Sequence, residues 1–353
     1  MRCRTLAREL CRRGAAITFL CRRQPGDLIS LLEQEFTVLA LPEQPLAAFD
    51  GLEGRDLYGA WLGCSQQQDA AECLAALAQA GISSGAQWLV VDHYGLDASW
   101  EGAMREGLGS EPPPQLLVID DLADRSHSCD LLLDQNFFGE ATERRYQGLV
   151  PPQCRQLLGP HYALLGPEYA LLHPLVPPRT GLRRVLVFFG GVDPQNYTGQ
   201  TIEALTAPEL AHLAVDVVLG LQCPHREAVE ILVEKRSHTT LHGPQPSLAG
   251  LIARADLAIG AGGSTIWERF CLGLPAISFV VAANQLKLNK AIAKHLKNSF
   301  KSNSKCMPAL EIPVRMHEFA AYPSYLQKQS KIIHGLCDGN GVARACAAII
   351  KTP

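Results

Sequence analysis

The stretch Leu257-Ala-Ile-Gly-Ala-Gly-Gly-Ser-Thr-Ile-Trp-Glu268 joins an apolar strand to a helix through a glycine turn. Paired glycines let the backbone come close to a phosphate, and the start of a helix offers free N–H groups and the positive end of its dipole. The Ser-Thr pair adds hydroxyls, and the glutamate falls in the first helical turn, where a carboxylate can bind both ribose hydroxyls. The alternative is a turn that needs glycine only for its geometry. The site residues predicted here are Gly262, Gly263, Ser264, Thr265 and Glu268.

Apolar runs of strand length recur along the chain and alternate with helical stretches, which predicts βαβ units, mainly parallel sheets and an α/β fold. The runs are Ala16–Cys21, Phe36–Leu41, Trp88–Asp92, Gln115–Asp120, Leu131–Asp134, Arg184–Phe189, Leu213–Leu219, Ala255–Ile259 and Ala276–Val281. Prolines are dense between residues 159 and 182 and interrupt both element types. We therefore expect two Rossmann-like lobes, residues 1–165 and 183–353, joined by a linker over 166–182.

The first lobe opens on a helix rather than on a strand. Cys3, Leu6, Ala7 and Leu10 share one helical face, and the first strand follows at Ala16–Cys21. In a doubly wound sheet the first strand is central and its loop contacts the ligand. We therefore expect this lobe to lack its first strand and loop, and to be poorly stable because two sheet edges stay unpaired.

Two more polar turns follow predicted strands of the second lobe. Gly190 and Gly191 come directly after the strand at Arg184–Phe189, and Asn284 and Gln285 follow the strand that ends near Val281. Ligands of open α/β sheets bind at the carboxyl ends of the strands, so these residues are candidates for phosphate or sugar contacts. For the glycine turn, the alternative is a loop whose Asp193 or Asn196 caps the next helix.

Polar clusters also end two strands of the first lobe. Asp92, His93 and Tyr94 follow one strand, and Asp120, Asp121 and Asp124 follow another. Carboxylates beside an imidazole suit hydroxyl recognition or acid–base catalysis, with Asp92 and His93 as the catalytic candidates. The alternative is that these side chains cap the following helices.

Composition excludes several classes of protein. The net charge of −3 gives no electrostatic reason to expect nucleic acid. No apolar run is long enough to cross a membrane and no signal peptide opens the chain. The twelve cysteines are scattered without CxxC pairs, which predicts reduced thiols and a cytoplasmic protein. The lysine-rich stretch over 287–305 is typical of a solvated helix face, and the alternative is a basic patch for an anionic partner. Neither GxGxxG nor a Walker A loop is present, so we expect no NAD or ATP-type cofactor. No Cys/His cluster has metal-site spacing, so we also expect no metal. A monomer is the expected state.

Several motifs in the same order resemble one known family. They are Met1-Arg-Cys-Arg-Thr-Leu-Ala7, Val91-Asp-His-Tyr-Gly-Leu-Asp97, Ile119-Asp-Asp-Leu-Ala-Asp-Arg125, Leu133-Asp-Gln-Asn136, Leu158-Gly-Pro-His-Tyr-Ala-Leu-Leu165, the turn at 260–268 and Asp338-Gly-Asn-Gly341. Over residues 1–285 the chain looks like the UDP-2,4-diacetamido-2,4,6-trideoxy-β-L-altropyranose hydrolase of pseudaminic acid biosynthesis. The resemblance implies a glycosyltransferase-B pair of lobes, similar to that of the MurG transferase.

The resemblance also implies roles for the candidate residues. Gly262, Gly263, Ser264, Thr265 and Glu268 would form the UDP pocket, Gly190 and Gly191 the phosphate-side turn, Asn284 and Gln285 further contacts, and Asp92, His93 and Tyr94 the sugar side. Water would attack the anomeric carbon with inversion as UDP departs, without a metal. The family's general base is a histidine in the loop before the Met-Arg-Cys helix, and this sequence shows neither that loop nor that histidine. The pattern also dissolves over 286–324.

Three hypotheses follow. The first is a hydrolase that releases UDP and a free sugar. The second is a UDP-sugar-dependent glycosyltransferase, because a UDP pocket does not distinguish water from an acceptor. The third is a UDP-sugar-binding relative that lacks activity because the first strand and its loop are missing.

Overall fold

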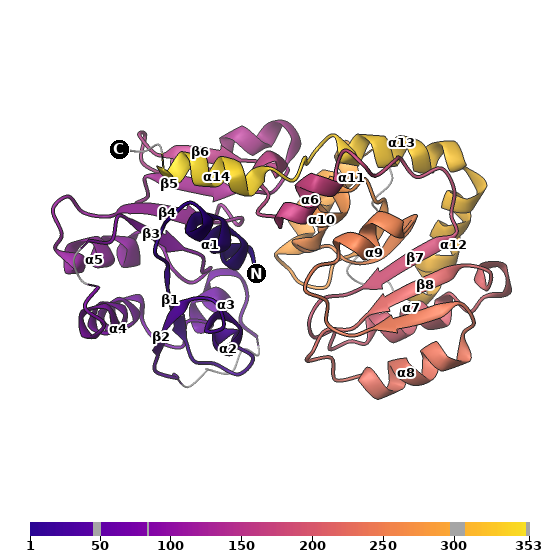
Figure 1. The fold of residues 1–353 in the computed structure, drawn as a ribbon, viewed down its shortest axis with the longest axis horizontal. Coiled ribbons are helices and arrows are strands. Elements are labelled where there is room, and N and C mark those ends of the chain that lie inside the picture. Colours follow the sequence, from indigo (N-terminus) through magenta and orange to yellow (C-terminus); the bar gives the residue numbers. More distant parts are fainter. Residues whose placement is uncertain (45–50, 83–84, 297–307, 351–353) are drawn as a thin grey trace. The chain divides into compact units, whose positions relative to one another are not determined.

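The computed structural model describes residues 1–44, 51–82, 85–296 and 308–350. The chain divides into two compact units. Unit 1 comprises Met1–Asn136, Ala141–Tyr162 and Ala343–Pro353, and unit 2 comprises Phe137–Glu140 and Ala163–Val342. Each unit is built from parallel strands and covering helices (Figure 1), so the predicted α/β class is confirmed.

Unit 2 contains one parallel sheet in the order β11-β10-β7-β8-β9. Its strands are β7 (Arg184–Phe188), β8 (Ala214–Val218), β9 (Thr239–His242), β10 (Leu257–Ala261) and β11 (Ala276–Phe279). Its helices are α6 (Pro167–Leu172), α7 (Tyr197–Ala204), η3 (Pro208–Leu210), α8 (Arg226–Lys235), α9 (Ala249–Arg254), α10 (Thr265–Cys271), α11 (Gln285–His295), α12 (Pro308–Ala321) and α13 (Pro323–His334). The chain adds β8 and β9 on one side of β7 and then returns to place β10 on the other. This reversal of strand order, between β7 and β10, is where open α/β sheets bind ligands.

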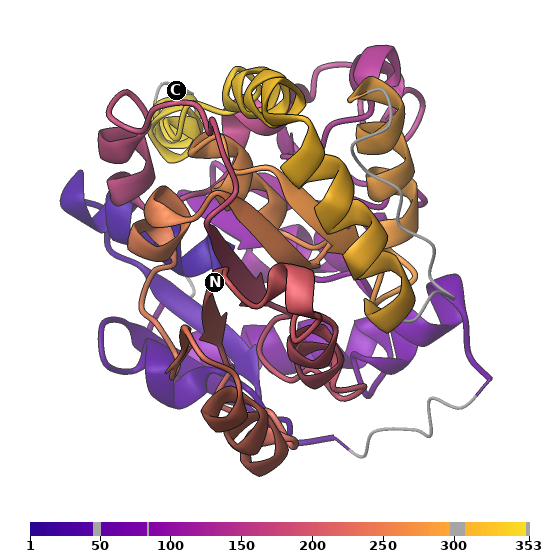
Figure 2. The ribbon, with the colours of Figure 1, turned by 90° about the vertical axis from the view of Figure 1, so that its right-hand side faces the viewer.

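Helices cover both faces of the unit 2 sheet, as parallel strands require. Val185 and Val187 of β7 pack into one apolar cluster with α7 and with the described side chains of α12, while Leu186 packs into a second cluster with α9 and α10. Figure 2 shows α12 and α13, in gold, following one another along one side of the unit. The alternation of β7 side chains between two cores explains why its sequence is apolar throughout.

Unit 1 also consists of parallel strands, but they form two separate sheets, β1-β2 and β3-β4-β5-β6. The strands are β1 (Thr18–Arg22), β2 (Thr37–Leu41), β3 (Trp88–Val91), β4 (Gln115–Ile119), β5 (Leu131–Asp134) and β6 (Arg155–Leu158). The helices are α1 (Arg2–Arg12), α2 (Ile29–Leu32), α3 (Gly54–Ala60), α4 (Gln66–Gln79), α5 (Ala98–Leu108), η2 (Pro160–Tyr162) and α14 (Gly341–Ile350), and η1 (Gly139–Arg144) runs from unit 2 into unit 1. β1 and β3 are not hydrogen-bonded to each other, which agrees with the unpaired edges expected from the sequence.

The division of the chain differs from the sequence-based expectation in two places. Residues 166–182, expected to be a linker, are packed into unit 2 and include α6. Pro167 occupies the first turn of that helix, where the missing N–H of proline costs nothing, so prolines there did not prevent a helix. The end of the chain, expected within the second lobe, returns to unit 1, where Arg344 of α14 donates to the carbonyl of His161 at 2.9 Å.

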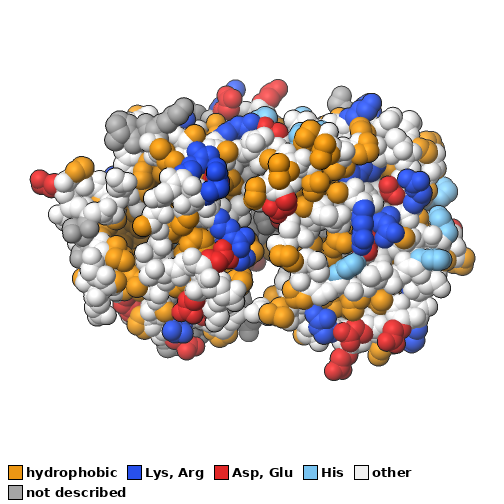
Figure 3. Space-filling model, viewed as in Figure 1, with side chains coloured by type: hydrophobic (Ala, Val, Ile, Leu, Met, Phe, Trp, Pro, Cys, Tyr) orange, Lys and Arg blue, Asp and Glu red, His pale blue; other side chains and the backbone are white. Residues whose placement is uncertain are grey.

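Charged side chains of both signs are interspersed on the surface seen in Figure 3. Within the lysine-rich stretch, Lys287 and Lys290 are exposed on α11, and the part from residue 297 to 305 lies outside the described residues. No helix in the described part of the chain combines the length and apolarity needed to cross a membrane.

A buried arginine anchors the segment that precedes β7. Arg179 is 5% exposed, and its guanidinium donates to the carbonyls of Ala255 at 3.0 Å, Ile252 at 2.8 Å and Leu272. Burial lowers the pKa of Arg179 to about 10, which still leaves the side chain charged at neutral pH. These carbonyls belong to the carboxyl ends of α9 and α10, so one side chain satisfies acceptors that two helices cannot satisfy themselves.

We expect Arg179→Met to destabilise unit 2 by about 3 kcal/mol or more, because it leaves several buried carbonyls without donors. Urea denaturation measures this loss. Arg183→Met is the matched control, since Arg183 is exposed and its backbone, which Met preserves, makes the bonds to Asp256 and Ala214. Equal unfolding midpoints for the two variants would contradict the anchoring role.

Candidate functional site

The glycine turn after β10 packs closely against the side-chain amide of Asn289. Gly262 donates to the carbonyl of Phe279 at 2.8 Å, and a Cβ on Gly262 would lie 2.3 Å from the amide of Asn289. Asn289 is 2% exposed and donates to the carbonyls of Gly262 at 2.9 Å and Gln285 at 2.7 Å. Only glycine fits at 262, because the amide that holds the turn occupies the space of a side chain.

The helix that follows this turn leaves its first hydroxyl available. Ser264 is the N-cap of α10, makes no side-chain cap bond and is exposed. Thr265 begins the helix beside it. Gly263 is partly exposed, and a Cβ there would meet only the Gln285 side chain, at 3.4 Å. The structure therefore brings Gly262, Gly263, Ser264, Thr265 and Gln285 together at the carboxyl end of β10, as the sequence predicts.

Glu268 lies in the first turn of α10 and is held by a partner that the sequence did not reveal. The hydroxyl of Tyr169, from α6, donates to Glu268 Oε2 at 2.8 Å. Burial raises the pKa of Glu268, while the hydrogen bond from Tyr169 and the charge of Arg269 oppose that shift. The tyrosine fixes one of the two carboxylate oxygens of Glu268.

The turn after β7 combines a glycine backbone with the cap of the next helix. Gly190 has φ +102°, a conformation that favours glycine. A Cβ on Gly220, after β8, would lie 2.0 Å from the carbonyl oxygen of Gly191, so these two loops are in close contact. Asp193 and Asn196 cap α7, with Asp193 accepting from Thr198 N–H at 2.8 Å. The capping interpretation is therefore confirmed, and Gly190 and Gly191 lie at the strand ends that flank the reversal of strand order.

Asn284 and Gln285 lie at the start of α11 and differ in how their side chains are bonded. It is the N-cap of α11, partly exposed, and makes no side-chain cap hydrogen bond. Gln285 folds back, and its Oε1 accepts from Val281 N–H at 3.1 Å. Of the two, Asn284 has the freer side chain.

In unit 1, Asp92 follows β3 and is paired with the first turn of α1. Arg2 donates to both of its carboxylate oxygens, at 2.7 and 3.1 Å, and also to Asp121 at 3.0 Å. Although burial raises the pKa of Asp92, the charge and hydrogen bonds of Arg2 hold it below its usual value. Asp92 is therefore an ionised carboxylate, and its side chain is 26% exposed.

His93 is oriented as a neutral imidazole. Its Nδ1 accepts from Gly95 N–H at 3.0 Å, so the remaining ring proton resides on Nε2. Burial lowers the pKa of His93, and the nearby Asp69 and Asp92 only partly oppose that shift. With its lone pair engaged, His93 can donate a hydrogen bond through Nε2 but cannot act as a base there.

Tyr94 belongs to an aromatic group that the sequence analysis missed. Its ring centroid lies 5.2 Å from that of Tyr58 and 6.1 Å from that of Trp61. Trp61 is 37% exposed. Aromatic faces next to carboxylates are suited to binding a sugar ring, because the C–H groups pack on the ring and the hydroxyls reach the charges. The sequence did not reveal this group because Tyr94 is distant in sequence from Tyr58 and Trp61, which lie at the end of α3.

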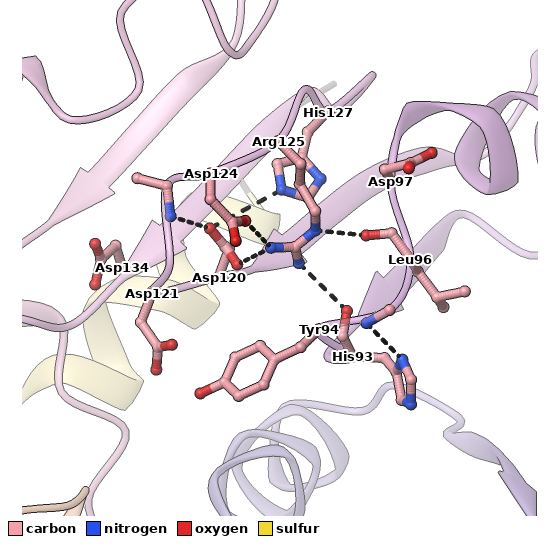
Figure 4. A network of polar contacts seen from close by, with 12 residues as sticks. His93, Tyr94, Leu96, Asp97, Asp120, Asp121, Asp124, Arg125, His127 and Asp134 are labelled. Atoms are coloured by element: carbon pink, nitrogen blue, oxygen red, sulfur yellow. Dashed lines mark hydrogen bonds and ion pairs between the residues drawn. The ribbon is translucent and has the colours of Figure 1, made fainter. Parts of the chain in front are cut away.

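A buried arginine connects the loops after β3 and β4 (Figure 4). Arg125 donates to Asp120 at 2.7 Å, to the carbonyl of Leu96 at 2.6 Å and to the carbonyl of His93 at 3.3 Å. It also pairs with Asp124 at 3.2 Å. Arg125 thus fixes the backbone that carries the candidate residues after β3, and Asp120 has a structural role.

Tyr146 lies between two carboxyl groups. Its hydroxyl is 2.9 Å from Asp120 Oδ2 and 3.2 Å from Asp134 Oδ2. Asp134 also accepts from Arg145 Nε at 2.9 Å and from Asn136 N–H at 2.9 Å. Burial raises the pKa of Asp134 to about 7, with Arg145 opposing the shift. Arg125 holds the pKa of Asp120 below its usual value against the effect of burial.

No metal site is found among the described residues: no group of three or more His, Cys, Asp or Glu side chains there could hold an ion. The Glu101–His127 pair, at 2.7 Å, is buried inside unit 1, where each side chain is the hydrogen-bond partner of the other.

Comparison with known proteins places the fold. No family model matches the chain. It is 24% identical over 242 residues to the spore coat polysaccharide biosynthesis protein SpsG of Bacillus subtilis (strain 168), covering 68% of this chain and 70% of that protein. The MurG structure of Acinetobacter baumannii aligns with a TM-score of 0.61 at 13% identity, over 99% of this chain and 95% of that one.

The UDP-GlcNAc 2-epimerase of Neisseria meningitidis, bound to UDP-GlcNAc, aligns with a TM-score of 0.54 at 11% identity, over 96% of this chain and 100% of that one. These similarities confirm the two-lobed, Rossmann-like glycosyltransferase-B fold. The resemblance to the pseudaminic acid hydrolase stays a prediction.

The raised pKa of Asp134 predicts a specific pH dependence of stability. Because its folded pKa is raised, its unfolded carboxyl loses the proton first, and stability falls between pH about 4 and about 7 by at most ~1.4 kcal/mol per pH unit. We expect Asp134→Asn to remove this slope. The free energy of unfolding of the variant, measured by urea denaturation, should therefore rise relative to that of the wild type as pH rises. Exposed Asp56→Asn should leave the slope unchanged. Parallel profiles for Asp134→Asn and wild type would exclude a buried proton on Asp134.

Proposed function

We propose that the chain hydrolyses a UDP-linked 2,4-diacetamido-2,4,6-trideoxy sugar at its anomeric carbon, releasing UDP and the free sugar. The observation that carries this proposal is the glycine turn after β10 with Glu268 behind it, beside the point where strand order reverses. Such a turn suits a diphosphate, and a carboxylate in the first helical turn suits a ribose. The neighbour that binds UDP-GlcNAc supports a nucleotide-sugar ligand, and the named motifs support the particular sugar.

In this proposal unit 2 binds the nucleotide. Backbone N–H groups around Gly262 and Gly263, with the Ser264 hydroxyl, bind the diphosphate, and Gly190 and Gly191 approach it from the next strand. Glu268 accepts the ribose hydroxyls through the oxygen that Tyr169 leaves available. Asn284 contributes an amide to the diphosphate or the sugar.

Unit 1 acts on the sugar. The bond between the anomeric carbon and the diphosphate oxygen breaks, its electron pair leaves with UDP, and a water oxygen bonds to the carbon from the opposite side. Asp92 is the better of the two catalytic candidates, because it is ionised and partly exposed while His93 Nδ1 is engaged. Asp92 orients the water, stabilises positive charge at the carbon and accepts the water proton. His93 Nε2–H and the rings of Tyr94 and Trp61 bind the sugar.

A glycosyltransferase is the second candidate, because the MurG-like fold and a UDP pocket suit an acceptor alcohol as well as water. A non-catalytic UDP-sugar-binding protein is the third, because Asp92 is already paired with Arg2. The three differ in what releases UDP.

Incubation with the UDP-linked diacetamido sugar and no acceptor distinguishes them. We expect steady release of UDP, measured by a coupled assay, and we expect Asp92→Asn to slow it by about 100-fold, within the usual range for loss of an acid–base group. Release that requires an added sugar acceptor would establish the transferase instead. UDP-sugar binding by calorimetry without release would establish the binding protein.

The nucleotide pocket has its own test. We expect Glu268→Ala to weaken UDP binding at least about tenfold, because two ribose hydroxyls lose a charged acceptor. Tyr169→Phe, which removes only the partner of Glu268, should change affinity by less, and exposed Glu234→Ala should not change it. Calorimetry measures all three, and unchanged UDP affinity in Glu268→Ala would refute the ribose assignment.

A further inference from the structure

Two cysteine side chains of unit 1 are in direct contact. Cys129 lies shortly before β5, Cys154 directly precedes β6, and their Sγ atoms are 3.5 Å apart. Both are free thiols, and they are 2% and 8% exposed respectively. Two thiols held in contact can be oxidised to one disulfide, which a single buried cysteine cannot form.

The hydrogen bonds distinguish the two thiols. Cys154 Sγ lies 3.6 Å from the carbonyl oxygen of Arg155, so its S–H can donate there while Cys129 S–H donates to Cys154 Sγ. The bond from Cys129 persists when Cys154 loses its proton, and it lowers the pKa of Cys154 although burial opposes the shift. The thiolate is the reactive form of cysteine, so Cys154, which is also the more exposed of the two, is the nucleophile of the pair.

The backbone around the two thiols suits a disulfide. The residues that follow the two cysteines are bonded to each other, because Arg155 N–H donates to the carbonyl of Asp130 at 2.9 Å. Neighbouring strands lie about 4.8 Å apart, and disulfides join Cα atoms that are about 4.4–6.8 Å apart. The two sulfurs must approach by roughly 1.5 Å to reach the covalent S–S length of about 2.05 Å, so small side-chain rotations are sufficient.

A bond between these cysteines would close the segment from residue 129 to residue 154. This segment holds β5, η1 and Tyr146, and it includes Phe137–Glu140, the short part of unit 2 that interrupts unit 1 in the sequence. Cys129 and Cys154 belong to the same apolar cluster as Tyr146. Closing a loop restricts the unfolded chain more than the folded one, so the expected consequence is a more stable unit 1.

We propose that Cys129 and Cys154 form a disulfide within the folded protein when it meets a peroxide. The Cys154 thiolate attacks one peroxide oxygen, the O–O bond breaks and Cys154 becomes a sulfenic acid. The sulfur of Cys129 then attacks the sulfur of Cys154, the S–O bond breaks and water leaves. With hydrogen peroxide, two thiols and one peroxide give one disulfide and two waters, so the thiols lose two electrons and the peroxide gains them. The inference does not depend on the proposed function.

Packing alone is the other explanation of the contact, because a buried cysteine behaves as a small apolar side chain. The two explanations differ in what a peroxide does to the folded chain. If the contact serves only packing, Cys129 and Cys154 stay reduced while an exposed thiol is oxidised. Cys11 is exposed, so loss of its thiol shows that the oxidant is active.

The test treats the folded full chain with hydrogen peroxide, blocks the remaining thiols with iodoacetamide in denaturant, and maps the peptides by mass spectrometry. Trypsin separates the two cysteines into the peptides 126–144 and 146–155, because arginine precedes and ends each of them. We expect these two peptides to be linked in about half of the chains or more, since groups held in contact react far faster than free ones. The linked pair should be lighter by two hydrogens than the separate peptides, and dithiothreitol should release it.

The same samples are compared by thermal denaturation. We expect the Tm of the oxidised wild type to lie about 5 °C or more above that of the reduced protein. Cys154→Ser should give neither the linked peptides nor this rise in Tm. Cys223→Ser is the matched control and should behave as the wild type, because Cys223 is also 8% exposed and, among the described residues, its thiol is not hydrogen-bonded to a second thiol.

Three results would overturn the proposal. The first is loss of the Cys11 thiol while the peptides 126–144 and 146–155 stay unlinked. The second is a linked pair that forms only after the chain is unfolded in urea, which would show that the fold does not hold the thiols for reaction. The third is a lower Tm for the linked chain, which would show that the bond strains the fold. UDP release is measured separately, so failure here is distinguishable from failure of the proposed hydrolysis.

Discussion

Every strand in the described part of the chain is paired in parallel, and a parallel strand must be shielded from water on both faces and bonded along both edges. In unit 2 this demand is met by a continuous five-stranded sheet between two apolar clusters. Polar side chains can then gather only where strands end. The same demand explains why the glycine turns, the capping aspartates and the acidic groups of unit 1 all follow strands. It is met least well between β1 and β3, which belong to separate sheets and are not hydrogen-bonded to each other.

Buried charges position the candidate residues rather than perform chemistry. Arg125 ties the backbone of His93 to Asp120, and Arg2 holds Asp92 ionised at the end of α1. In unit 2, Asn289 performs the corresponding task for the Gly262 turn with a neutral amide. In the proposed function this turn binds a diphosphate, and a neutral support avoids the repulsion that a carboxylate beneath it would cause.

The periodicity of apolar residues was sufficient to predict the α/β class, the two lobes and the incomplete first sheet, because burial on both faces leaves a direct mark on the sequence. It missed the four-residue strands β6 and β9, which are only partly buried. The glycine turn and Glu268 were predicted because their spacing is local. Tyr169, Asn289, Arg2 and Trp61 were not, since each reaches its partner across a distance in sequence that no short pattern records.

The return of α14 to unit 1 makes that unit discontinuous in sequence, with unit 2 inserted before its last helix. During synthesis on the ribosome the amino-terminal segments emerge first, yet their final helix is translated only after the whole of unit 2. Unit 2 can therefore fold while unit 1 still awaits Arg344 and its bond to His161. Completion of unit 1 therefore follows translation of unit 2, although most of unit 1 is translated first.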